Sequence, residues 1–207
     1  MWYKIKRIYQ WTNLVRPVPY TPTNSTLAYF PFTNNALDQL GNYTLSNSWT
    51  KQSIWYLFNV KTDISWVSDY SQQKFASYWV KFQASDNTTV LIGCWWLRVN
   101  NRTVSAPSYS EFVFKDSGWS FHNLWNNWIN NSTWYHVAYW WEWNTYKTYV
   151  NWVLKNSGSA TPAQYSECWI VWWTNWVILS EVIFEKSMRT ATEVSNYYNQ
   201  TKSNYWL

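Results

Sequence analysis

The stretch Thr145-Tyr-Lys-Thr-Tyr-Val-Asn-Trp-Val-Leu154 decides the fold class of this chain. Tyr146, Thr148 and Val150 fall on one face of an extended strand, and the residues between them fall on the other. This alternation predicts a half-buried strand with one wet face. Asn151-Trp152 then stands where a two-residue hairpin turn belongs. A type I′ turn needs positive φ at both central residues, so Asn-Gly is its strongest signal. Here tryptophan occupies the position of glycine.

The composition of the whole chain shows the same excess of tryptophan and shortage of glycine. There are 21 Trp and 4 Gly in 207 residues, whereas average usage would give about 15 Gly. Trp143 and Trp176 also stand beside asparagines at turn-like positions. A left-handed residue that carries a Cβ costs about 1–2 kcal/mol, which glycine avoids.

Two hypotheses explain this pattern. In the first, the turn tryptophans are glycines of a genome that reads the UGA codon as glycine. In the second, they are genuine and form an aromatic binding surface. Trp79 and Trp134 lie in strand-like runs and are genuine aromatics under both hypotheses.

The length fits one domain with a short N-terminal appendage. We predict a strand or clip and a proline-rich linker over residues 1–22, and the main domain over residues 23–207. The formal charge of +5 is modest, and no nucleic-acid partner is predicted. No apolar run reaches the ~18 residues of a membrane helix, and the first residues are too polar for a signal peptide. We therefore expect no membrane insertion, and a chain that is either used inside a cell or released without the general secretion route. Viral assembly and lysis would be one such release, and a virion or an extracellular surface is the suspected location.

Short extended runs recur at spacings of about 8–14 residues, as in all-β sandwiches. One helix is predicted near the C-terminus. Thr190-Ala-Thr-Glu193 is a capping box, and Val194, Tyr197, Tyr198 and Thr201 follow on one helical face. The predicted strands are 27–32, 42–45, 54–59, 75–83, 88–94, 96–100, 110–114, 118–122, 134–141, 145–150, 168–172 and 177–185.

Four segments follow one another in a fixed order over about 180 residues. They are Leu27–Asn42, Thr133–Ala138, Thr145–Trp152 and Val177–Thr201. In this order they resemble the opening, central strand, hairpin and closing strand with helix of concanavalin A-like, laminin-G-like jelly-roll lectin domains. The hairpin of that family usually ends in Tyr-Val-Asn-Gly, from which this chain departs. The resemblance implies an all-β, two-sheet antiparallel jelly-roll sandwich with one short C-terminal helix.

Related glucanases carry catalytic carboxylates in a Glu-x-Asp-x-x-Glu arrangement, which this sequence lacks. The nearest pair, Glu181 and Glu185, would lie roughly 13 Å apart along a strand. Glycoside hydrolysis needs ~5–5.5 Å for retention or ~6.5–9.5 Å for inversion. We therefore predict that the chain is not an enzyme, with a degenerate glycoside hydrolase as an alternative. Glu181 is interpreted as structural, Glu185 as solvated, and His136 as a strand histidine whose hydrogen bonds are satisfied.

Sugar recognition combines an aromatic platform with amide and carboxylate groups, and the segment Asp116–Asn127 has this mixture. Trp119 is predicted to stack on a sugar. Asp116, His122, Asn123 and Asn126 are predicted to hydrogen-bond to it. The competing interpretation places Trp119 in the core. The function this favours is a non-catalytic carbohydrate- or receptor-binding module, with a glycan or cell-surface receptor as partner.

Two weaker signals complete the sequence analysis. Asp38 and Asn42 offer oxygen ligands for calcium, but an Asx turn capped by Gly41 is the favoured interpretation, and no cofactor is required. Residues 1–16 resemble leader segments of virion and surface-display proteins, which implies docking to other virion or structural proteins. The alternative function is therefore a purely structural decoration protein that binds only other proteins.

Overall fold

The computed structural model describes the chain over the following ranges. They are 20–31, 39–40, 44–46, 49–52, 55–58, 62–65, 73–82, 90–92, 99–104, 109–115, 121–127, 133–159, 168–171 and 177–205. The strands are β1 (Thr26–Phe30), β2 (Thr44–Ser46), β3 (Trp49–Gln52), β4 (Trp55–Phe58), β5 (Thr62–Ser65), β6 (Phe75–Phe82), β7 (Val90–Ile92), β8 (Val99–Val104), β9 (Tyr109–Lys115), β10 (Phe121–Asn127), β11 (Trp134–Glu142), β12 (Thr145–Val150), β13 (Val153–Ser159), β14 (Cys168–Val171) and β15 (Val177–Glu185). The helix α2 (Ala191–Thr201) and the 3₁₀ turn η2 (Lys202–Tyr205) follow them.

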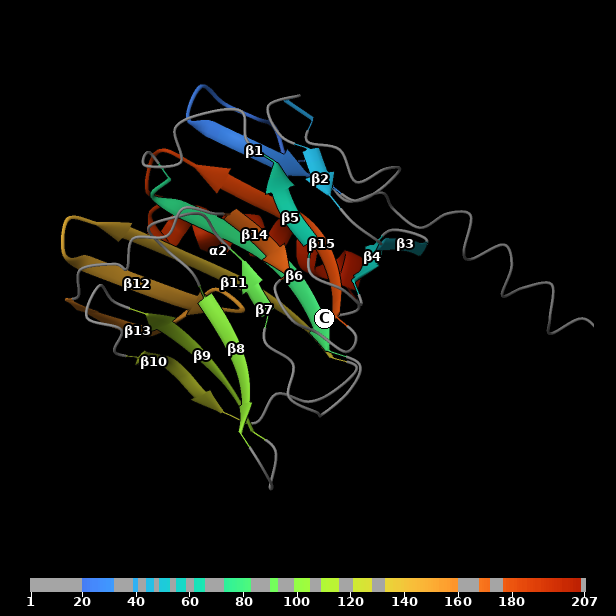
Figure 1. Cartoon of the computed structure of the whole chain (residues 1–207). Helices are drawn as coiled ribbons and strands as arrows, with labels where there is room; N and C mark the ends of the chain where they lie inside the picture. The colour runs from blue at the N-terminus through green and yellow to red at the C-terminus, as the bar shows by residue number, and fades with distance from the viewer. Residues whose placement is uncertain are drawn as a thin grey trace, which may run out of the picture.

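The strands of the described part pair into antiparallel sheets that pack in two layers (Figure 1). An eight-stranded sheet has the order β13-β12-β11-β6-β15-β4-β3, and β1 pairs with β15 beside this path. The other layer holds a four-stranded sheet, β10-β9-β8-β7, and a three-stranded sheet, β14-β5-β2. Strand β14 lies beside β7, so these two smaller sheets continue one another. The all-β sandwich with one short C-terminal helix is therefore confirmed.

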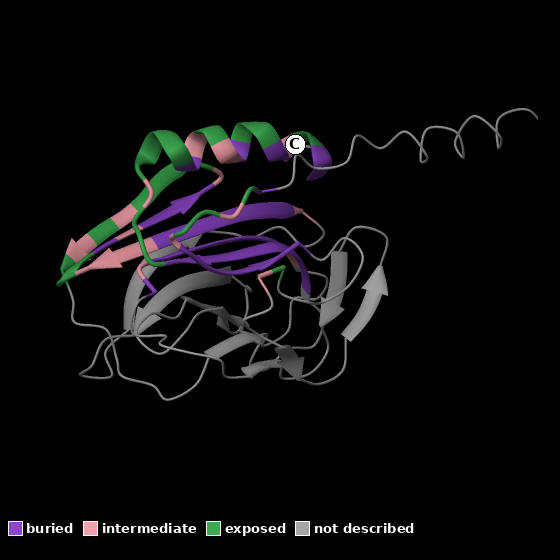
Figure 2. Cartoon of the chain, turned by 90° about the horizontal axis from the view of Figure 1, so that it is seen from above, coloured by how far each residue is buried: buried purple, intermediate pink, exposed green. Residues whose placement is uncertain are grey.

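The eight-stranded sheet is covered on both faces. Residues 75–80 of β6 are all buried, although successive side chains of a strand point to opposite faces. Trp79 faces α2 and η2, where its ring stacks on Tyr198 and Tyr205 with centroids 5.7 Å and 4.0 Å away. Figure 2 shows α2 lying along this face of the sheet, with its exposed residues turned outward. The sheet is thus the middle layer of the domain.

Helix α2 begins as the sequence predicts. The backbone N–H of Glu193 donates to Thr190 Oγ1 at 3.2 Å, and the Thr190 N–H donates to Glu193 Oε2 at 2.7 Å, which completes the capping box. Val194, Tyr198 and Thr201 are buried against the sheet, and Tyr197 is half-buried. No helix in the described ranges combines the length and apolarity that a membrane crossing requires.

The outer face of β12 is less wet than the alternation predicts. Tyr149 belongs to this face and is buried in a cluster with Val194 of α2. Lys147 lies over the ring of Trp140 at 5.1 Å. Only the far end of the strand, at Thr145, is exposed. The helix therefore covers part of a face that strand periodicity alone assigns to water.

Both hairpin turns beside β12 place tryptophan in the left-handed region. In the turn from β12 to β13, φ is 47° at Asn151 and 65° at Trp152. In the turn from β11 to β12, φ is 56° at Trp143, whose side chain is 83% exposed. These are the positions at which primed hairpin turns favour glycine. Trp176, the third suspect turn position, lies outside the described residues.

Two tryptophans and three strands remain to be compared with the sequence predictions. Trp79 lies within β6 and Trp134 opens β11, as predicted, and both side chains are buried. Strands β3, β5 and β13 were not among the predicted strands. Most residues of β13 are polar and exposed, and it pairs with β12 at the edge of the sheet. Its strand state comes from backbone pairing, which leaves no alternating apolar pattern in the sequence.

Candidate ligand-binding site

The sequence-predicted sugar site lies only partly within the described residues. His122, Asn123 and Asn126 are on β10, at the edge of the four-stranded sheet, and their register partners lie on β9. The register shifts between Asn123 and Trp125, so an irregularity separates Asn126 from the other two. Asp116 and Trp119 fall outside the described residues, and this site stays a prediction.

The predicted calcium ligands, Asp38 and Asn42, also lie outside the described residues. Within the described ranges, no cluster of three or more His, Cys, Asp or Glu side chains could hold a metal ion.

The described residues do form a pocket of about 340 Å³ beside α2. Residues of the N-terminal segment 20–23 form one wall, and one face of α2 together with Arg189 forms the other. The lining side chains are those of Tyr20, Thr21, Thr23, Arg189, Glu193, Asn196, Tyr197 and Gln200. Tyr20 is buried, and Arg189 and Tyr197 are half-buried. The other lining residues form an exposed rim: Thr21, Thr23, Glu193, Asn196 and Gln200. The pocket therefore has a polar rim and two aromatic side chains deeper in its wall.

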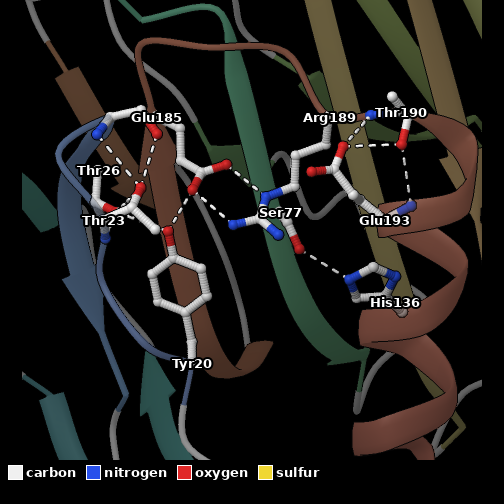
Figure 3. A network of polar contacts seen from close by, with 10 residues as sticks. Tyr20, Thr23, Thr26, Ser77, His136, Glu185, Arg189, Thr190 and Glu193 are labelled. Atoms are coloured by element: carbon white, nitrogen blue, oxygen red, sulfur yellow. Dashed lines mark hydrogen bonds and ion pairs between the residues drawn. The ribbon is translucent and has the colours of Figure 1, made fainter.

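Arg189, one of the lining residues, forms an ion pair with the buried Glu185 (Figure 3). Arg189 donates to both carboxylate oxygens of Glu185, from Nε at 2.6 Å and from Nη2 at 2.7 Å. The Tyr20 hydroxyl donates to Glu185 and also contacts Thr26 Oγ1 at 2.7 Å. The Arg189 guanidinium lies 5.2 Å from the Tyr20 ring centroid. These contacts fix the positions of the tyrosine ring and of the arginine.

The ionisation of these groups follows from their burial. Burial, together with the hydrogen bond to Glu185, raises the pKa of Tyr20 to about 12. Burial alone would lower the pKa of Arg189, but the hydrogen bonds and charge of Glu185 raise it overall. Arg189 is therefore charged and Tyr20 protonated at every physiological pH. The prediction that Glu185 is solvated was wrong: it is 1% exposed, because residues 20–26 and Arg189 cover it.

The second wall residue, Tyr197, is fixed by another buried carboxyl group. Its hydroxyl donates to Glu181 Oε2 at 2.9 Å, and the Tyr205 hydroxyl lies 3.3 Å from the same oxygen. Glu181 is 1% exposed, with φ of 50°, where the register of β15 against β6 shifts between Ser180 and Ile183. Burial raises the pKa of Glu181 to about 7. Glu181 thus anchors α2 and η2 to the sheet, in line with its structural interpretation.

The histidine of β11 is enclosed in the core. His136 is fully buried, and its Nε2 lies 2.8 Å from Ser77 Oγ. Burial lowers the pKa of His136 to about 3, so the imidazole is neutral. The prediction of full hydrogen bonding was only partly right, because Nδ1 has no hydrogen-bond partner.

The residues of α2 that line the pocket have a regular spacing in the sequence. Glu193, Asn196, Tyr197 and Gln200 are spaced as i, i+3, i+4 and i+7, so they share one helical face. Helical periodicity alone places Tyr197 on the buried face instead. The prolines predict a linker over residues 20–22, whereas the ring of Tyr20 packs against that of Tyr29 with centroids 5.0 Å apart.

No protein-family model matches the chain, and no curated protein matches it. Several solved structures do match the chain. Domain 4 of AbnA, a GH43 extracellular arabinanase from Geobacillus stearothermophilus, was solved in complex with arabinotriose. It superposes with a TM-score of 0.61 at 19% identity, over 84% of this chain and 98% of that one.

The binding domain of botulinum neurotoxin serotype D gives a TM-score of 0.67 at 12% identity. The binding domain of Paraclostridial Mosquitocidal Protein 1 gives 0.64 at 11% identity. The chain covers about half of each toxin domain, 51% and 52% respectively. At these identities the likeness shows the fold: this chain shares its β-sandwich with domains that are binding rather than catalytic units.

Proposed function

We propose that this chain is a non-catalytic module that binds carbohydrate or a cell-surface receptor. The observation that carries the proposal is the pocket beside α2, which combines fixed tyrosine rings with hydroxyl and amide groups. Small-molecule sites have this character: a concave surface with apolar walls and a few well-placed polar groups. The fold likeness to an arabinanase domain solved with arabinotriose supports the same conclusion.

The carboxyl groups of β15 favour binding over hydrolysis. A glycosidase needs one carboxyl group as acid and a second as nucleophile or base, both reaching the substrate. Glu185 is held by Arg189 and Tyr20, and Glu181 is held by Tyr197 and Tyr205. Both are nearly inaccessible to solvent. Neither can reach a glycosidic bond without the loss of these contacts.

The finer features of the proposal come from the sequence. We assign the module to the concanavalin A-like, laminin-G-like sandwiches, and place it on a virion or a cell surface. Residues 1–16 would dock it to other virion or structural proteins. The segment from Asp116 to Asn126 would be a further sugar-contacting surface. Asp38 and Asn42 would be calcium ligands, so binding assays need a parallel arm with chelator.

The proposal is tested with the full chain on a glycan array and, in parallel, on intact cells. Saturable binding to a defined set of glycans, or to cells in a glycosidase-sensitive manner, is the expected result. Binding to neither would contradict it and would favour the structural alternative. Hydrolysis of an oligosaccharide that Glu181→Gln abolishes would refute the non-catalytic part.

A further inference from the structure

We propose that the pocket between residues 20–23 and α2 is the sugar site, and that it takes an uncharged glycan end of one or two rings. This inference rests on the proposed function and names the ligand class and the site for it. The volume of about 340 Å³ is at the lower end of the ~300–1,000 Å³ range of small-molecule sites. It therefore suits a small terminal unit rather than a long chain.

The charges around the pocket leave one carboxylate without a cationic partner in the described structure. The lining holds one arginine and one glutamate, and the arginine is already paired with Glu185, which is not a lining residue. Arg189 is paired with Glu185 through two hydrogen bonds. Glu193 Oε2 accepts from the backbone N–H and the hydroxyl of Thr190. Glu193 therefore keeps its negative charge, while Arg189 is already paired, so an anionic glycan is disfavoured here and an uncharged one is favoured.

The polar groups that remain suit hydroxyls. The side chains of Thr21, Asn196 and Gln200 line the pocket, and within the described structure no hydrogen bond engages them. Each amide offers both donors and an acceptor, which is what a sugar hydroxyl requires. Asn196 and Gln200 are four residues apart on α2, so their Cβ atoms are about 5–6 Å apart on one face. Two neighbouring hydroxyls can be contacted at this spacing.

The half-buried ring of Tyr197 supplies the apolar part of the recognition, and the buried ring of Tyr20 supports it from the side. The rings of Tyr20 and Tyr197 lie 6.5 Å apart at an interplanar angle of 83°, so they meet at nearly a right angle. Their hydroxyls are held by Glu185 and Glu181, and both side chains pack in one cluster around Ile183. A ring fixed in this way loses little entropy when a ligand binds. The accessible part of the Tyr197 ring suits the carbon face of a single sugar ring.

The experiment uses the full chain and the uncharged glycans that the array identifies, with affinities measured by calorimetry. The double variant Asn196→Ala, Gln200→Ala should bind at least about tenfold more weakly, since it loses two amide contacts. Asn199→Ala is the matched control, because Asn199 is an exposed asparagine of the same helix outside the pocket. It should bind like the parent. All three positions are exposed, and thermal unfolding confirms that each variant folds.

Two outcomes would overturn the inference while the proposed function stands. One is a parent chain that binds glycans while the double variant binds equally well. A loss of binding on Trp119→Ala or Asn126→Ala would then assign the sugar site to the segment around β10. The other is a preference for sialylated or sulfated glycans over their uncharged counterparts. If the parent binds no glycan and no cell, the proposed function itself fails.

Discussion

The left-handed backbone of the two hairpin turns predicts whether glycine or alanine is the more stabilising residue there. At Trp143 and Trp152, φ is 56° and 65°. At each position we compare the glycine variant with the alanine variant. Both substitutions remove the indole ring, so the loss of its contacts nearly cancels in the comparison. Only the alanine variant keeps a Cβ, which conflicts with the left-handed backbone.

The expected difference follows from two opposing terms. The left-handed penalty of about 1–2 kcal/mol falls on alanine, whereas glycine loses about 0.5–1 kcal/mol more backbone entropy on folding. Trp143→Gly should therefore be more stable than Trp143→Ala by about 1 kcal/mol, with the same result at Trp152. In a domain of this size, that is roughly 2–4 °C in Tm. The turns lie at opposite ends of β12, about 20 Å apart, so the two differences should add.

Trp140 is the matched control, because it lies within β11 and is not among the positive-φ residues. There the order should reverse, with alanine more stable than glycine. Chemical denaturation measures all of these free energies of unfolding. If alanine equals or exceeds glycine at 143 and 152, the steric reasoning is refuted. The recoding hypothesis makes a companion prediction: the natural product carries glycine at these turns, and its codons at positions 143, 152 and 176 are UGA.

Three further predictions concern buried polar groups and the helix cap. The folded-state pKa of Glu181 is raised from 4.5 to about 7, so its contribution to the free energy of unfolding is full below pH 4.5 and is lost as the pH rises through 7. Glu181→Gln should remove this pH-dependent loss of about 3 kcal/mol, which a pH series of denaturant titrations measures. The pKa of His136 is lowered from 6.5 to about 3, so its contribution to the free energy of unfolding is full above pH 6.5 and is lost on acidification. His136→Asn should reduce the loss of stability at acid pH by up to about 5 kcal/mol. An unchanged loss at acid pH would show that His136 is not its source. Thr190→Ala removes the cap of α2 and should cost about 1 kcal/mol in thermal unfolding, with the nearby Thr192→Ala nearly neutral.

Some of the fold was predictable because its signals are local. The hairpin from Thr145 to Leu154 is predicted by the alternation of side chains along its first strand and by the turn dipeptide Asn151-Trp152. The capping box at Thr190 is recognised from four consecutive residues. Strand β13 could not be predicted in the same way, since its polar residues reveal nothing of the backbone pairing that orders them.

The candidate site was harder to predict because it joins distant segments. Tyr20 and Glu185 are 165 residues apart in sequence, and no local pattern brings them together. The burial of Glu185 depends on the chain crossing β15 at residues 20–26, which periodicity cannot show. The bulge at Glu181 is hidden for a related reason: positive φ at a glutamate has no sequence signature.

Residue-resolved NMR titration tests the central claim most directly. The chain, labelled with ¹⁵N, is titrated with an uncharged glycan that binds on the array. The account predicts that the largest saturable shift changes fall on residues 20–23 and on the α2 face of Asn196 and Gln200. Changes confined to residues 121–127, with the α2 resonances unmoved, would contradict it.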